Sequence, residues 1–189
     1  MHICSVRNPA WLTWIAPEEL SDQDLFRIVI FFVFHSPCAN LSSMGKTLDK
    51  YGWNSPWRKP YYLNRQLRQA TSNYELLFSV KSYDKMDAAL EKANLKDNFP
   101  SELSRERICI YDNQENQFLS VFYHIRNAFA HCRLNMVDVN GECVFILEDV
   151  QPNKHSDQLK VSARMILRKS TLLKWIEIIE NGECEYQKR

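Results

Sequence analysis

Arginine, asparagine and histidine lie close together in a segment of the chain that is otherwise apolar. Arg126 and Asn127 are adjacent, and His131 follows four residues after the asparagine. An imidazole titrates near neutral pH and can move the proton of a ribose 2′-hydroxyl. A guanidinium can hold the phosphate on which negative charge builds during cleavage. These residue types therefore predict a site that cuts RNA without a metal ion.

The segment is predicted to end a helix that begins near residues 113–115. Its buried face consists of apolar residues within about 60° of one another, namely Phe118, Phe122, Ile125 and Phe129. A polar stripe on another arc consists of Ser120, His124, Asn127 and His131. In an ideal helix Arg126 and His131 point about 140° apart. Either the helix unwinds at Ala130, or the site combines side chains from two protomers.

The run Arg126-Asn127-Ala128-Phe129-Ala130-His131 resembles the Arg-polar-x-x-x-His signature of the HEPN superfamily. These are helical domains, many of which are toxins or defence ribonucleases. The surroundings agree, because several predicted helices precede the motif and another closes the domain. The resemblance covers the motif closely and the fold loosely, and it extends to plasmid or bacterial HEPN-like proteins with a hairpin after the motif.

The resemblance implies metal-independent cleavage that leaves a 2′,3′-cyclic phosphate and a 5′-hydroxyl. It assigns His131 as general acid or base, Arg126 as the group that stabilises the phosphorane, and Asn127 as the group that orients phosphate or histidine. It also implies a two-fold homodimer that pairs its motifs across a cleft. In HEPN toxins silenced by nucleotide attachment, a tyrosine stands two residues after the histidine. Here that residue is Arg133, which argues against this regulation and would add a second positive charge.

Composition places the chain among globular proteins. With 189 residues, 45% of them hydrophobic and 25% charged, it can bury a continuous core as one domain over residues 1–189. A net charge of +1 gives no overall attraction to nucleic acid, so local patches must supply it. The six cysteines form no CxxC pair, no secretory signal is recognised, and the apolar run 28–34 is too short to span a bilayer. We expect a cytoplasmic protein without a membrane partner.

The order of predicted elements indicates a mainly α, HEPN-like helical bundle. Helices are expected at about 21–34, 39–50, 61–81, 84–92, 113–131 and 170–181. A β elaboration at about 136–168 follows the motif helix, with a hairpin turn at Asn140-Gly141 and a third strand at 159–167. The expected protein is therefore all-α apart from this small insertion.

A basic and aromatic stretch between Lys50 and Tyr74 is a candidate RNA surface. Its cations include Arg58, Lys59, Arg65 and Arg68, and they are interleaved with Trp53, Trp57, Tyr61 and Tyr62. The alternative is a solvated helix face beside an aromatic core. His124 and Arg133 are further candidates for RNA contact, although His124 can also be an exposed polar residue.

Other functional readings remain open. His131 can instead be a buried histidine with a structural hydrogen bond, and Arg126 can form an ordinary ion pair. His124, His131 and Cys132 lack the ligand spacing of a structural zinc site, so we expect no metal and no cofactor. The alternative to an endoribonuclease of toxin or anti-phage type is a non-catalytic module that binds RNA, a nucleotide or a protein. A third possibility is an antitoxin or regulatory subunit, and a toxin would itself have an antitoxin protein as partner.

Overall fold

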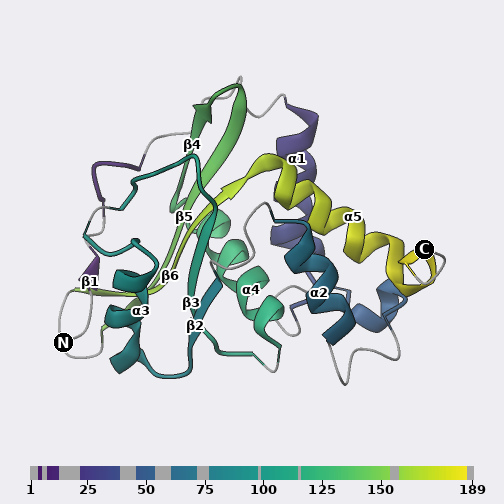
Figure 1. Cartoon of the computed structure of the whole chain (residues 1–189), viewed down its shortest axis with the longest axis horizontal. Coiled ribbons are helices and arrows are strands. Elements are labelled where there is room, and N and C mark those ends of the chain that lie inside the picture. The colour runs from purple at the N-terminus through teal and green to yellow at the C-terminus, as the bar shows by residue number, and fades with distance from the viewer. Residues whose placement is uncertain are drawn as a thin grey trace.

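A mixed β-sheet forms the centre of the protein in the computed structural model. The structure describes residues 4–5, 8–12, 22–38, 46–53, 61–71, 77–97, 99–114, 116–153 and 158–186. Six strands pair in the order β2-β3-β6-β5-β4, and β1 pairs with β6 outside this path. Helix α3 covers one face of the sheet, whereas α1, α2, α4 and α5 lie on the other side (Figure 1).

The strands are β1 (Cys4–Ser5), β2 (Leu77–Val80), β3 (Arg107–Tyr111), β4 (Leu134–Val139), β5 (Glu142–Pro152) and β6 (Leu159–Arg168). Only β2 and β3 run parallel among the described pairs, with Leu77 opposite Ile108. Because parallel strands end at the same edge of a sheet, the residues that follow β2 and β3 lie close together. This edge positions much of the site described below.

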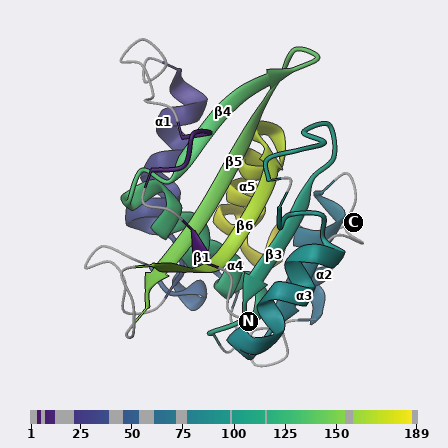
Figure 2. The ribbon, with the colours of Figure 1, turned by 90° about the vertical axis from the view of Figure 1, so that its left-hand side faces the viewer.

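The helices are α1 (Gln23–Val29), the π-helix η2 (Ile30–His35), the 3₁₀ helices η3 (Leu48–Tyr51) and η6 (Tyr83–Lys85), α2 (Tyr61–Gln69), α3 (Met86–Lys92), α4 (Gln117–Ala130) and α5 (Lys169–Tyr186). Helix α3 connects β2 to β3, as the parallel pairing of these strands requires. Seen from the side of α3, the β4–β5 hairpin and β6 lie in front of α4 and α5 (Figure 2). No helix among the described residues is long and apolar enough to cross a membrane.

The larger core lies between the sheet and α1, η2, α4 and α5. Aromatic rings meet edge to face there, with 5.6 Å between the ring centroids of Phe32 and Phe122 and 5.7 Å between those of Phe118 and Trp175. The indole of Trp175 also donates a hydrogen bond of 2.7 Å to the carbonyl of Leu67. These contacts hold the apolar back of α4 in place.

A smaller core lies on the opposite face of the sheet, under α3. Met86, Leu90 and Ala93 are buried there against Cys109 and Ile166. The sheet is thus covered on both faces, which explains why its central strands β3, β5 and β6 carry long buried runs.

The expectation of a mainly α, all-α bundle is wrong, because the protein has an α/β fold. The expected hairpin is present, with positive φ at Asn140 (57°) and Gly141 (82°), but it belongs to a sheet that also includes β2 and β3. Strand β2 lies inside the stretch 61–81 that was expected to be one helix, because Leu77 continues the helical spacing of the apolar residues before it. Pairing with β3, a tertiary interaction, decides its conformation.

Several helix boundaries also differ from the expectation. The first helix is capped by Asp22, whose carboxylate accepts from the backbone of Asp24 at 2.8 Å, and Ser21 lies outside the described residues. Of the helix expected at 39–50, residues 39–45 lie outside the described part, and η3 occupies 48–51. The closing helix reaches Tyr186, with a non-helical residue at Gly182.

Candidate functional site

Helix α4 carries the motif, and both of its ends are fixed by hydrogen bonds. At the start, the side chain of Asn116 accepts from the backbone of Phe118 at 2.8 Å. At the end, the backbone nitrogens of Cys132 and Arg133 donate to the carbonyls of Phe129 and Ala128 at 3.1 and 2.8 Å. Cys132 adopts a left-handed conformation with φ of 51°, as a residue just past a helix end commonly does. The chain therefore turns away directly after His131.

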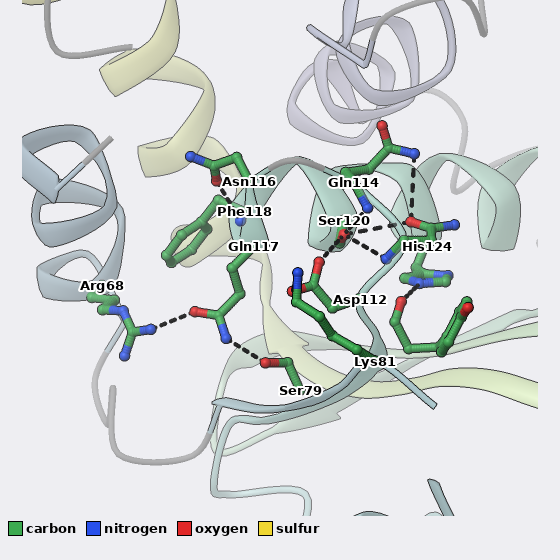
Figure 3. A network of polar contacts seen from close by, with 12 residues as sticks. Arg68, Ser79, Lys81, Asp112, Gln114, Asn116, Gln117, Phe118, Ser120 and His124 are labelled. Atoms are coloured by element: carbon green, nitrogen blue, oxygen red, sulfur yellow. Dashed lines mark hydrogen bonds and ion pairs between the residues drawn. The ribbon is translucent and has the colours of Figure 1, made fainter. Parts of the chain in front are cut away.

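One side of α4 carries polar residues that face other elements, and we call Gln117, Ser120, His124 and Asn127 the polar seam. Gln117 accepts a hydrogen bond from Arg68 of α2 and donates one of 2.6 Å to Ser79 of β2. Ser120 donates to Asp112 just after β3 at 2.7 Å (Figure 3). The seam therefore joins α4 to the carboxyl ends of the two parallel strands.

His124 is the most deeply enclosed member of the polar seam. It has no exposed surface, and its ring nitrogens lie 2.7 Å from two oxygens, Nδ1 from the Asp149 carboxylate and Nε2 from the Tyr111 carbonyl. A carbonyl only accepts, so Nε2 carries a proton. Both ring nitrogens are therefore engaged within the protein, and the imidazole is held in a fixed orientation.

The same carboxylate orients the arginine of the motif through Asn127. The Asn127 amide donates to Asp149 Oδ2 at 3.2 Å, and its oxygen accepts from Arg126 Nη1 at 3.1 Å. An amide has one donating and one accepting end, so these two partners fix its orientation. Arg126 is thus held by a chain of contacts that runs through Asn127 to Asp149 and His124.

The accessible face of α4 differs from the polar seam. With about 100° per residue, the side chains of this face fall in one arc of about 140°, and we call this set the open arc: Tyr123, Arg126, Asn127, Ala130 and His131. The first three are half-buried, and Ala130 and His131 are exposed. Arg126 and His131 stand at the two margins of the open arc, with the small Ala130 between them. Both side chains therefore belong to one accessible face of the helix, at its opposite margins.

The polar stripe expected from the sequence is thus divided in the structure. Ser120 and His124 are buried in contacts, Asn127 lies at the boundary, and His131 is exposed at the helix end. The side chain of His131 makes no hydrogen bond or ion pair with the described residues. The alternative interpretation, that His131 is a buried histidine with a structural hydrogen bond, is therefore wrong.

The other candidate residues lie in different surroundings. Arg133 is 7% exposed and forms an ion pair with Glu148, which Arg164 also contacts at 2.9 Å. Its charge is therefore committed to the interior and does not add to a phosphate site. Arg65 of α2 is exposed, and Arg68 is half-buried against Gln117. Arg58 and Lys59 lie outside the described residues.

The residues that follow η2 close one side of the motif. Burial raises the pKa of the Cys38 thiol to about 12, against the opposing influence of the nearby Ser36 hydroxyl and the Arg126 guanidinium. The thiol donates a hydrogen bond of 3.4 Å to the carbonyl of Leu119 in α4. Cys38 is therefore a protonated neighbour of Arg126 at neutral pH and not a thiolate.

Sequence reasoning missed Asp149, the residue on which the site depends. In strand β5 the buried apolar run 144–147 is followed directly by Glu148 and Asp149, which are both almost fully buried. Two consecutive acids in a strand buried on both faces are unusual unless each has a partner. That pattern was the available signal.

Comparison with known proteins adds no relative. No protein-family model, no curated protein and no solved structure matches the chain. Among the described residues, no three histidine, cysteine or acidic side chains are grouped as metal ligands. The likeness to the HEPN superfamily therefore rests on the residues from Arg126 to His131.

Proposed function

We propose that this protein is a metal-independent endoribonuclease of the toxin or anti-phage defence type, with the open arc of α4 as its active surface. The main support for this proposal is that the two ends of the motif lie in different surroundings. Arg126 is held through Asn127 by a buried carboxylate, whereas His131 is exposed at the end of the same helix. A fixed cation beside a histidine without internal partners suits charge stabilisation and proton transfer.

The proposed reaction uses only groups of the chain and the RNA. The 2′-oxygen attacks the adjacent phosphorus, the bond from phosphorus to the 5′-oxygen breaks, and a 2′,3′-cyclic phosphate remains. His131 takes the proton of the 2′-hydroxyl, and a second acid gives a proton to the departing 5′-oxygen. Arg126 stabilises the negative charge on the phosphorane.

A two-fold homodimer supplies the second proton carrier. One chain holds one exposed motif histidine, but the reaction needs both a base and an acid. Pairing of two open arcs across a symmetry axis brings a second His131 to the cleft, and it lets Arg126 of one protomer meet His131 of the other. This arrangement also removes the difficulty that the two side chains point about 140° apart on one helix.

End-group analysis tests the reaction. Purified protein is incubated with RNA in excess EDTA, beside the same oligonucleotide with 2′-deoxyribose throughout. Products with a 2′,3′-cyclic phosphate and a 5′-hydroxyl are expected from RNA, and none from the deoxy substrate. Cleavage of both substrates would contradict attack by the 2′-hydroxyl.

A binding module without turnover is the second candidate. It is favoured by the lack of any described partner that orients the ring of His131, since a catalytic imidazole usually has a second group that fixes it. Intact RNA together with retained binding would support the module. Growth arrest on expression that His131→Ala abolishes would support a toxin over an antitoxin or assembly subunit.

A further inference from the structure

Three tyrosines from three different elements lie beside the polar seam, and we call Tyr83, Tyr111 and Tyr123 the tyrosine cluster. Tyr83 begins η6 just after β2, Tyr111 ends β3, and Tyr123 belongs to the open arc of α4. The rings of Tyr83 and Tyr111 are stacked, with 4.1 Å between centroids and 22° between planes. The ring of Tyr123 stands edge-on to His124 at 5.2 Å. All three tyrosines remain half-exposed.

The tyrosine cluster lies directly against the residues that hold the motif. Burial raises the pKa of Tyr83, and Tyr111, Asp149 and Tyr123 raise it further. The Tyr83 hydroxyl is buried and has no hydrogen-bond partner among the described residues. The carbonyl of Tyr111 contacts His124, His124 contacts Asp149, and Asp149 holds Asn127, so this chain of contacts connects the cluster to Arg126.

Cations accompany the tyrosines. The ammonium of Lys160 lies 5.8 Å from the centroid of the Tyr83 ring. The side chain of Lys81 is 78% exposed and lies 3.6 Å from the carboxylate of Asp112. Aromatic rings for bases and cations for the backbone are the two components of surfaces that bind single-stranded nucleic acid.

We infer that the tyrosine cluster is the subsite for an unpaired base of the RNA, adjacent to the phosphate held at Arg126. The inference rests on the proposed function and names its substrate class as single-stranded RNA. Bases inside a duplex are stacked on each other and cannot reach the rings, so a paired strand does not fill this subsite. Lys81 and Lys160 then face the neighbouring phosphates.

Binding of an uncleavable strand tests the subsite. The probe is a 2′-O-methyl RNA hexanucleotide with one 2-aminopurine, a fluorescent base whose emission falls when it stacks on an aromatic ring. Quenching on titration with the parent protein is expected. Tyr123→Ala should weaken binding about 10-fold through the loss of one stacking contact, while Tyr123→Phe should bind like the parent. Phe26→Ala removes an aromatic ring that is 62% exposed on α1, and it should change nothing.

The outcomes separate this inference from the nuclease proposal. Quenching and a Tyr123→Ala defect without cleavage of normal RNA would support the subsite and reject turnover. Cleavage with unchanged affinity in Tyr123→Ala would overturn the subsite and leave turnover standing. If Tyr123→Ala does not fold, the parent protein still tests the inference. A probe that stays unquenched at saturation, or tighter binding of a duplex than of the single strand, would overturn it.

Discussion

The arginine of the motif depends on a carboxylate that it does not touch. Asp149 is 3% exposed and lies within hydrogen-bond distance of both His124 and Asn127. Its contacts with His124 and Asn127 fix its place, and Asn127 transmits its position to Arg126. Asp149 and His124 are therefore positioning residues of the proposed site, and the groups proposed to contact RNA lie on the open arc.

Replacement of this carboxylate tests its role. Asp149→Asn replaces the buried carboxylate that contacts both His124 and Asn127 with an amide, and it leaves a buried polar group poorly paired. We expect the free energy of unfolding to fall by about 2 kcal/mol, measured by urea denaturation. RNA cleavage should fall as well, because Asn127 and Arg126 lose their orientation. A variant with the stability and rate of the parent would contradict the chain of contacts.

The buried thiol of Cys109 should make the fold less stable at alkaline pH. Burial raises the pKa of Cys109 from 9.0 to about 12. A raised pKa stabilises the fold fully below pH 9, and this contribution is lost as the pH rises toward 12. Between pH 8 and 10.5 the parent should therefore lose about 2 kcal/mol more than Cys109→Val. Urea unfolding at the two pH values measures this difference. If the parent and Cys109→Val lose the same free energy of unfolding, the burial argument is contradicted.

Among the helices and strands, local sequence patterns predicted the elements whose formation depends on local chemistry. Asn140-Gly141 indicated the β4–β5 turn because both residues adopt positive φ. The apolar spacing of residues 118–129 indicated α4 and its buried face. Patterns failed for β2 and β3, which are short and depend on each other through the α3 crossover. The fold class therefore required tertiary information.

The candidate site was predictable to a similar extent. The motif residues and their helix were evident from spacing, but Asp149 and the tyrosine cluster come from strands and loops that meet α4 only in the folded chain. For Arg133 the prediction was wrong in the other direction. Its place close to the motif suggested contact with a phosphate, but in the structure it forms an ion pair with Glu148. Spacing along one helix does not identify partners from β5.

The end of α4 offers a stabilising substitution. Cys132 has a φ of 51°, a conformation that costs a residue with a side chain about 1 kcal/mol and costs glycine almost nothing. Cys132→Gly should therefore stabilise the fold by about 0.5 kcal/mol after the extra freedom of glycine in the unfolded chain is included. Thermal unfolding measures it, and a lower Tm than that of the parent would contradict the expectation. Cleavage should persist, since His131 keeps its place.

At the scale of the whole molecule, the sheet is a platform on which one helix is exposed along a single arc. Because the net charge is only +1, the proposed attraction to RNA has to come from local cations, namely Arg126, Lys81 and Lys160. Binding should therefore weaken with rising salt, with a slope set by the few phosphates that these cations meet.

The oligomeric state of the protein tests the proposed pairing of the motifs. The proposed dimer should appear in sedimentation velocity at micromolar concentration. Mixing the parent with an excess of His131→Ala should lower the cleavage rate per parent chain, because a mixed dimer keeps only one of the two His131 side chains that the reaction uses. A monomer, or a rate per parent chain that the variant does not change, would contradict pairing of the motifs across two protomers.

In the proposed reaction His131 moves a proton at a phosphate held by Arg126. The most direct test of this step is the single-turnover rate of RNA cleavage in EDTA for the parent, His131→Ala and a matched control, His35→Ala, which alters a histidine of η2. The account predicts a loss of about 10²–10⁴-fold for His131→Ala and a parental rate for the control. Equal rates for the parent and His131→Ala would contradict it.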